Sequence, residues 1–259
     1  MVRDLVLLLL LAASAVTLMI HGRQLQPKAD SHIAGLNGNA GVQMEFAKNS
    51  TDVSGLLGEA GFDNPNWAIM RQQQYLDFPF IVLYWAVFFY TIGGPLRSST
   101  ASAGHTLGYS LGLFITIAAL ADFLEDGGIL AALSSSHQGL LWPFPFGVTK
   151  WLFVFLSLGL SGCFLVSYPK LGVFAFPAST LSTALVRITG AFFLAAGLTG
   201  LIGAVGAIFQ KGPLVLLGGL LSFIGSIFLI VAVALGLVAS SHRGQSSTDS
   251  ETHAASGHL

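Results

Sequence analysis

The sequence predicts an all-α fold, a polytopic transmembrane helical bundle of about six helices with a small outer segment between the first and second helices. Composition is the first observation behind this prediction. Apolar residues make up 53% of the 259 positions and charged residues 9%, against about 25% charged in a typical soluble domain. The second observation is that the apolar residues gather in long stretches separated by short polar ones.

Six apolar segments account for the expected helices. They cover approximately residues 5–20, 78–95, 106–124, 151–168, 185–209 and 213–239. A membrane-spanning helix needs about 20 mostly apolar residues, and the last five segments qualify. Lipid offers no partner to exposed backbone N–H and C=O groups, so each spanning segment is expected to be helical.

The first segment fits two interpretations. Arg3 followed by an apolar run and Ala13-Ser14-Ala15 is typical of a signal peptide with its cleavage site. The apolar run nevertheless continues to Ile20, where a cleaved signal normally turns polar. The sequence therefore favours an uncleaved N-terminal helix or signal anchor over residues 1–20.

Basic residues in the short loops predict the orientation, because Lys and Arg are enriched on the cytoplasmic side. Placing the amino terminus inside puts most of them there: Arg3, Arg97, Lys170, Arg187 and Arg243. Lys150 and Lys211 then lie in or beside short outer loops. The expected layout, in the plasma (inner) membrane, is the first helix at 1–20, an extracytoplasmic segment at 21–76, a five-helix transmembrane bundle at 77–239 and a disordered cytoplasmic tail at 240–259.

The outer segment is expected to hold some regular structure. Val42, Met44 and Phe46 alternate with polar residues, which predicts a short strand. Asn49-Ser50-Thr51 offers capping oxygens for a helical turn that Gly58 ends. Asn64-Pro65 is typical of a helix start, and that helix is expected to run into the second membrane segment.

Glycines at helical spacing predict where helices pack closely, since small residues let two backbones approach each other. Two sets stand out in the third and fifth segments: Gly104, Gly108 and Gly112, then Gly197, Gly200 and Gly203. The fifth and sixth segments are joined by the short turn 210–213 and are expected to form an antiparallel hairpin. A glycine-lined pore or hinge is the alternative interpretation.

Three carboxylates lie close together in the run Ala121–Asp126, at the end of the third apolar segment. At about 100° per residue, Asp122 lies on the same helix face as Gly104, and Glu125 and Asp126 share that side. We therefore expect all three carboxylates to face the bundle rather than lipid, at its outer rim.

Asp77 precedes the second membrane segment and Lys150 precedes the fourth, so both are expected at the same rim. Lys150 is the natural counter-ion of Glu125 or Asp122, in an ion pair that fixes the loop between the third and fourth segments. Alternatively, carboxylates at this rim and His137 could bind a divalent cation, whose identity stays open. The candidate ion-pair or cation site comprises Asp77, Asp122, Glu125, Asp126 and Lys150.

Other functions find little support in the sequence. The net charge of −1, without a basic stripe, argues against nucleic-acid binding. The single cysteine, Cys163, cannot form an intrachain disulfide. The sequence contains no nucleophile elbow, Walker loop, His-Glu-x-x-His pair or Cys-x-x-Cys motif, so an enzyme is disfavoured and no cofactor is expected.

Three short motifs carry a resemblance to other proteins: Met44-Glu45-Phe46-Ala47, Tyr75-Leu76-Asp77-Phe78, and the run 121–126 followed by Lys150-Trp151. Together they resemble an uncharacterised group of bacterial multi-pass membrane proteins with an Ala-Asp-x-x-Glu-Asn signature and a downstream Lys-Trp. The resemblance covers roughly residues 42–165, and Asp126 stands where that group has Asn. It implies a membrane location and a helical fold, but no particular activity.

Two function classes follow from these features. The first is a scaffold or accessory protein that binds lipid, or a protein partner through residues 21–76. Glycine packing and the scarcity of polar residues in the helix centres favour it. The second is a small-solute or cation transporter that uses the outer acidic cluster as its entry site. The lipid bilayer is the expected surrounding in both cases.

Overall fold

The computed structural model describes residues 2–25, 33, 40–59, 64–99, 102–134, 143–167, 180–209 and 213–256, which form helices and no strand. The elements are α1 (Val2–Gly22), α2 (Ala40–Glu45), α3 (Ser50–Leu57), α4 (Pro65–Ala86), the π-helix η2 (Val87–Ile92), α5 (Gly93–Arg97), α6 (Ser102–Ser134), α7 (Pro143–Ser167), α8 (Thr180–Ile208) and α9 (Pro213–Ser256). In this described part of the chain, six helical segments are long and apolar enough to cross a membrane, and α4, η2 and α5 together form one of them. The predicted multi-pass helical bundle is confirmed.

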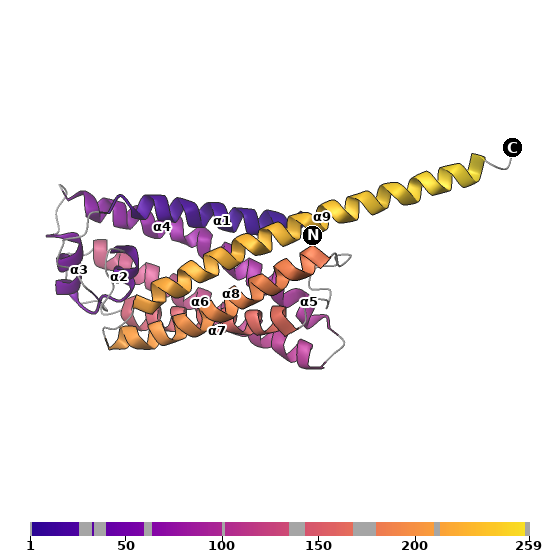
Figure 1. The fold of residues 1–259 in the computed structure, drawn as a ribbon. Coiled ribbons are helices and arrows are strands. Elements are labelled where there is room, and N and C mark those ends of the chain that lie inside the picture. The colour runs from indigo at the N-terminus through magenta and orange to yellow at the C-terminus, as the bar shows by residue number, and fades with distance from the viewer. Residues whose placement is uncertain are drawn as a thin grey trace.

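The long helices pack largely in chain order. Helix α7 lies between α6 and α8, α8 packs along α9, and α1 runs along α4. Helices α2 and α3 lie at one end of the bundle, whereas the start of α1 and the end of α9 lie at the other (Figure 1). The start of α1 and the end of α9 are therefore on the same side, as an even number of spans requires.

The segment between α1 and α4 contains two short helices, and the predicted strand is wrong. Residues Ala40–Glu45 are helical, and Gln43 is buried as completely as Met44. An alternation over five residues is too short to separate a strand from a helix. Because α2 is covered on several faces, it also lacks the single apolar stripe that would have identified it as a helix.

The predicted starts of α3 and α4 are confirmed. The side chain of Asn49 accepts a hydrogen bond from the backbone N–H three residues later, at 2.9 Å, and so caps α3. Gly58 ends α3 with φ of 89°, a conformation that favours glycine. Asn64 caps α4 in a similar way, with Pro65 in the first turn, and α4 continues into the membrane-spanning segment.

Two hydrophobic clusters are present among the described residues. The larger fills the bundle, and the smaller joins α2 and α3 to the start of α4 and the last turns of α6 through residues such as Trp67 and Ile129. Met44 belongs to the smaller cluster and Phe46 to the larger one, so Glu45 stands at their boundary. The segment between α1 and α4 is thus packed onto the bundle, and the last residue of α2 lies beside the core of the bundle.

Both glycine sets face closely packed neighbours. A Cβ added to Gly108 would lie 2.6 Å from the backbone nitrogen of Arg97, and one added to Gly197 would lie 2.6 Å from Cα of Gly159. Gly203 faces the backbone at the start of α9, which closes the α8–α9 hairpin. The remaining members of the two sets also face neighbouring residues: Gly104, Gly112 and Gly200. These contacts correspond to packing positions rather than to a glycine-lined pore.

The π-helix η2 is a feature that the sequence does not reveal. Arg97 donates a hydrogen bond through Nη2 to the carbonyl oxygen of Phe89 at 2.6 Å, and its guanidinium lies 4.0 Å from the centre of the Phe89 ring. Thr91, on the same π-helix, donates to the Asp4 carboxylate at 3.2 Å. This contact attaches α1 to the second span, at the end of the bundle opposite α2.

Helix α9 is longer than the sixth apolar segment. It continues to Ser256 and projects away from the bundle (Figure 1), whereas residues 240–259 are predicted to be disordered. An existing helix adds residues without a new nucleation step, which accounts for its extension into a polar segment.

Candidate functional site

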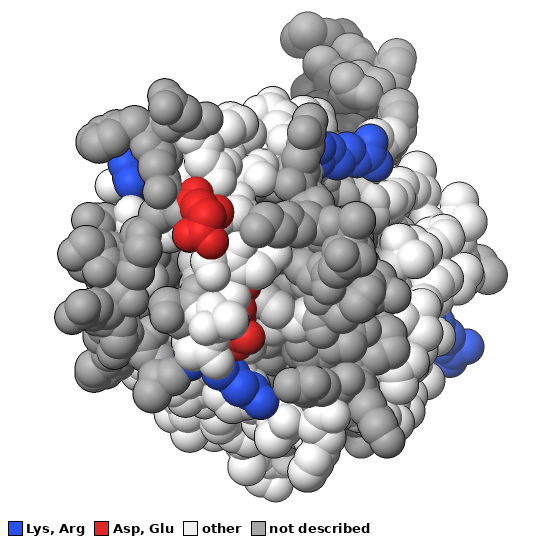
Figure 2. Space-filling model, turned by 90° about the vertical axis from the view of Figure 1, so that its left-hand side faces the viewer, with Lys and Arg blue, Asp and Glu red and all other residues white. Residues whose placement is uncertain are grey.

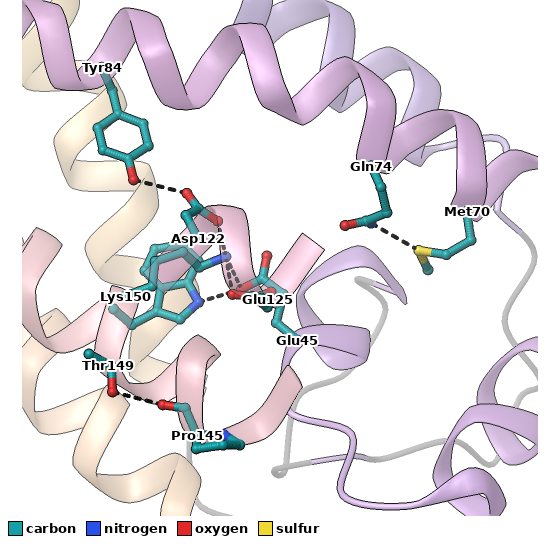
Figure 3. A network of polar contacts seen from close by, with 10 residues as sticks. Glu45, Met70, Gln74, Tyr84, Asp122, Glu125, Pro145, Thr149 and Lys150 are labelled. Carbon is teal, nitrogen blue, oxygen red and sulfur yellow. Dashed lines mark hydrogen bonds and ion pairs between the residues drawn. The ribbon is translucent and has the colours of Figure 1, made fainter. Parts of the chain in front are cut away.

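Lys150 lies at the centre of a buried charge cluster where α2, α6 and α7 meet (Figure 3). Its Nζ atom is 2.8 Å from Oε2 of Glu125, 2.9 Å from Oε2 of Glu45 and 3.0 Å from Oδ1 of Asp122. The Lys150 side chain is 6% exposed. Lys150 therefore pairs with both carboxylates that the sequence offers as its counter-ions, and with a third from the outer segment.

Glu45 reaches Lys150 because α2 lies directly on α7. A Cβ at Gly147 would be 2.5 Å from the carbonyl oxygen of Glu45, so this close approach depends on glycine. The indole Nε1 of Trp151 donates a hydrogen bond to the same Glu45 carboxylate that Lys150 binds. Burial raises the pKa of the Glu45 carboxyl above its ordinary value, the charge of Lys150 lowers it and that of Asp122 raises it further.

The three carboxylates of α6 face inward, on the helix side that the sequence predicts. Asp122, Glu125 and Asp126 are 3%, 0% and 1% exposed. Asp122 accepts a second contact through Oδ2, from the hydroxyl of Tyr84 on α4 at 3.0 Å. The cluster thus links α2, α4, α6 and α7.

The cluster contains more negative than positive charge. Five carboxyl groups interact with the single amino group of Lys150 in the described part of the chain: Glu45, Asp77, Asp122, Glu125 and Asp126. At an effective dielectric constant of about 20, two like charges about 4 Å apart repel each other by about 4 kcal/mol. Full ionisation would therefore be costly, and the cluster must hold additional positive charge, either as protons or as a cation.

Part of the cluster has the geometry of a cation site. Asp77, Asp122 and Asp126 each offer one carboxylate oxygen, and these oxygens lie within 4.8 Å of one another. An all-oxygen ligand set suits hard cations such as Ca²⁺ and Mg²⁺. Glu125, which the sequence also suggests as a ligand, instead pairs with Lys150.

The sequence patterns do not point to two members of the cluster, Glu45 and Tyr84. Glu45 is the only charged residue in the short buried helix α2, which is the signal that could have indicated a buried partner. Tyr84 lies seven residues after Asp77 and so shares its face of α4. Three residues that the sequence suggests as loop charges or ligands lie outside the described part of the chain: His137, Lys170 and Lys211.

The cluster does not form an open acidic surface. Figure 2 shows the end of the molecule that carries α2 and α3, where the charged side chains of described residues are scattered rather than gathered into a patch of one sign. The acidic groups of α6 lie underneath, at most 3% exposed. Helix α2 lies next to them, since Glu45 contacts the same Lys150 that pairs with Asp122 and Glu125.

No protein-family model, curated protein or solved structure matches the chain. The site geometry therefore provides the main basis for a proposed function.

Proposed function

We propose that the chain is a membrane scaffold or accessory protein whose outer segment, held on the bundle by Lys150, binds a protein partner or lipid. The observation that carries the proposal is the 2.9 Å ion pair between Lys150 and Glu45, which joins α7 to α2 at the boundary of the two hydrophobic clusters. A segment fixed in this way presents a defined surface outside the membrane, as a binding platform requires.

The bundle interior supports a structural role. Outside the charge cluster, the buried polar side chains of the described residues are few and uncharged: Gln43, Gln74, Thr91, Ser157, Ser161 and Thr189. Ser157 donates to a carbonyl of its own helix at 2.8 Å, which satisfies its hydroxyl locally. A transport pathway normally places ionisable or strongly polar groups along the length of the membrane.

We place the protein in the inner (plasma) membrane of a bacterium, with both termini in the cytoplasm and the outer segment outside. The distribution of Lys and Arg in the short loops supports this orientation. The resemblance of the three short motifs to a bacterial group of membrane proteins supports the location.

A small-solute or cation transporter is the second candidate. The excess of buried carboxylates favours it, because such a cluster attracts cations or protons. Purified protein reconstituted in liposomes separates the two candidates. A scaffold gives no cation or proton flux above that of empty liposomes, whereas a flux that Asp122→Asn abolishes would establish transport instead.

Photo-cross-linking in native membranes tests directly whether the outer segment binds a protein partner or lipid. A photoreactive amino acid is introduced at Thr51 or Glu59, which are exposed on the outer segment, and at Leu198, which is 58% exposed on α8 and serves as the lipid-facing control. We expect a discrete protein or lipid adduct from the two outer positions, and a weaker adduct when Glu45→Gln loosens the outer segment. Identical products from all three positions would contradict the proposal.

A further inference from the structure

Asp126 carries a carboxylate that no described residue neutralises. Its Oδ2 atom is buried without a hydrogen-bond partner, and the residue is 1% exposed. In the described part of the chain, the ion pairs of Lys150 involve Glu45, Asp122 and Glu125, and no lysine or arginine forms an ion pair with Asp77 or Asp126. A buried carboxylate in this state is costly unless a cation or a proton compensates its charge.

Gln74 provides a second, independent observation. Its Oε1 atom is buried without a hydrogen-bond partner, and the residue is 4% exposed. The amide nitrogen donates to the sulfur of Met70 at 3.5 Å, which leaves the oxygen pointing to the side of the carboxylates of α6 (Figure 3). Gln74 lies three residues before Asp77 on α4, so a neutral oxygen stands close to the acidic group.

The spread of the carboxylate oxygens is small enough for all three to contact one ion. Oxygen ligands lie about 2.4 Å from Ca²⁺, so two ligands on opposite sides of the ion are about 4.8 Å apart. The oxygens of Asp77, Asp122 and Asp126 lie within 4.8 Å of one another. Mg²⁺ demands near-ideal octahedral geometry and usually keeps several waters, whereas Ca²⁺ accepts a flexible set of protein oxygens, so a largely buried set of three aspartates and an amide oxygen favours the larger ion.

We propose that Asp77, Asp122 and Asp126 bind one Ca²⁺-like divalent cation, with the oxygen of Gln74 beside it. The ion bridges α4 and α6 and supplies the positive charge that Lys150 does not provide to Asp77 and Asp126. Asp77 is the least buried of the three and forms the edge through which the ion enters. The ion stays bound as part of the structure, so the inference depends on neither the scaffold nor the transporter proposal.

Titration of the purified full-length chain tests this site. The protein is stripped with EDTA, exchanged into metal-free detergent buffer at pH 7, and titrated calorimetrically with CaCl₂ or MgCl₂. We expect saturable binding of one Ca²⁺ per chain and weaker binding of Mg²⁺. Binding should weaken when the pH is lowered to 5, because protons compete for carboxylate ligands.

Asp126→Asn is the informative variant, because it keeps the size of the side chain and leaves the contacts of Lys150 intact. We expect it to weaken Ca²⁺ binding by about tenfold or more, since affinity follows the charge of the ligand set. Glu59→Gln removes an exposed carboxylate from the outer segment and should bind Ca²⁺ like the wild type. If Asp126→Asn does not purify as a folded protein, Asp77→Asn replaces it.

Absence of saturable Ca²⁺ binding to the wild type would overturn the proposal and assign the missing positive charge to protons. Undiminished binding by the aspartate variant would overturn it as well. Both results come from pure protein without a partner, so they leave the scaffold proposal untouched.

Discussion

The Nζ atom of Lys150 lies 2.9 Å from Oε2 of Glu45, and this contact joins the outer segment to the membrane bundle. The same amino group contacts Asp122 and Glu125 on α6. One buried cation therefore holds three helices together, at the boundary between the two hydrophobic clusters.

Replacing Lys150 by alanine should destabilise the protein severely. The variant leaves three buried carboxylates without their cation, and removing one partner of a buried ion pair costs about 3–5 kcal/mol. Thermal unfolding in detergent, followed by circular dichroism, measures the loss. Arg23→Ala removes an exposed cation near the end of α1 and should leave the midpoint almost unchanged. Equal midpoints for the two variants would show that Lys150 does not stabilise the cluster.

Tyr84→Phe should lower stability by about 1.5–3 kcal/mol, because it removes a hydrogen bond to a buried charged acceptor. The hydroxyl of Tyr84 donates to Asp122 at 3.0 Å, and both residues are buried. Tyr75 lies on the same helix but is 58% exposed, so Tyr75→Phe is the matched control. The difference between the unfolding midpoints of the two variants measures the contribution of the Tyr84–Asp122 hydrogen bond. A negligible difference would show that this bond does not stabilise the protein.

The pH dependence of stability should show the raised pKa of the Glu45 carboxyl. Burial raises its carboxyl pKa above the ordinary value of 4.5, despite the charge of Lys150, and the charge of Asp122 acts in the same direction as burial. The folded state therefore holds this proton more tightly than the unfolded chain does. The resulting contribution to stability is fully present below about pH 4.5 and is lost as the pH rises through the folded-state pKa.

Glu45→Gln should consequently show a shallower fall of the unfolding midpoint with rising pH above about 4.5 than the wild type does. The other groups that face this carboxylate, Lys150 and Trp151 on α7 and Asp122 on α6, remain in the variant. Glu59→Gln, in an exposed position, should reproduce the wild-type slope. A steeper fall of the unfolding midpoint in Glu45→Gln than in the wild type would contradict a raised pKa of the Glu45 carboxyl.

Two glycines of α6 provide a packing test within one helix. A Cβ at Gly108 would lie 2.6 Å from the backbone nitrogen of Arg97, whereas a Cβ at Gly127 would have nothing within 4 Å. Gly108→Ala should cost about 1–3 kcal/mol through overpacking. Gly127→Ala should be neutral or stabilising by up to about 1 kcal/mol, because alanine favours helix. If both substitutions have the same effect on the unfolding midpoint, the close approach is not important for stability.

Cysteine labelling in intact cells tests the orientation. Cys163 is first replaced by alanine, and single cysteines are then introduced at Glu59 and Ser98, which are exposed at opposite ends of the bundle. A membrane-impermeant maleimide should label position 59 in intact cells and position 98 only after permeabilisation. The reverse pattern would place α2 and α3 in the cytoplasm.

Much of the fold could be predicted, because an apolar segment of 18 or more residues in lipid must satisfy its backbone hydrogen bonds internally, and a helix does so. Within α6, the constant rotation of about 100° per residue was enough to place Asp122 and its two acidic neighbours on the inner face. The same reasoning could not detect η2, because a constant rotation of about 100° per residue assumes α-helical geometry throughout.

Glu45 was harder to predict for a physical reason. Its neighbours Met44 and Phe46 are both fully buried, but in two different hydrophobic clusters. Contacts on both sides of α2 remove the one-sided pattern that identifies a surface helix. The pairing of Glu45 with Lys150 depends on how α2 docks on α7, and this long-range contact leaves no periodic signal in the sequence.

Hydrogen–deuterium exchange of α2 tests most directly whether Lys150 holds the outer segment on the bundle. The wild type and Lys150→Met are compared in detergent, with the amides of α8 as the internal reference. We expect the amides of Ala40–Glu45 to exchange at least about tenfold faster in the variant, while those of α8 are unchanged, because local opening follows the loss of local contacts. Equal protection of α2 in both proteins would contradict the central role of the Lys150–Glu45 contact.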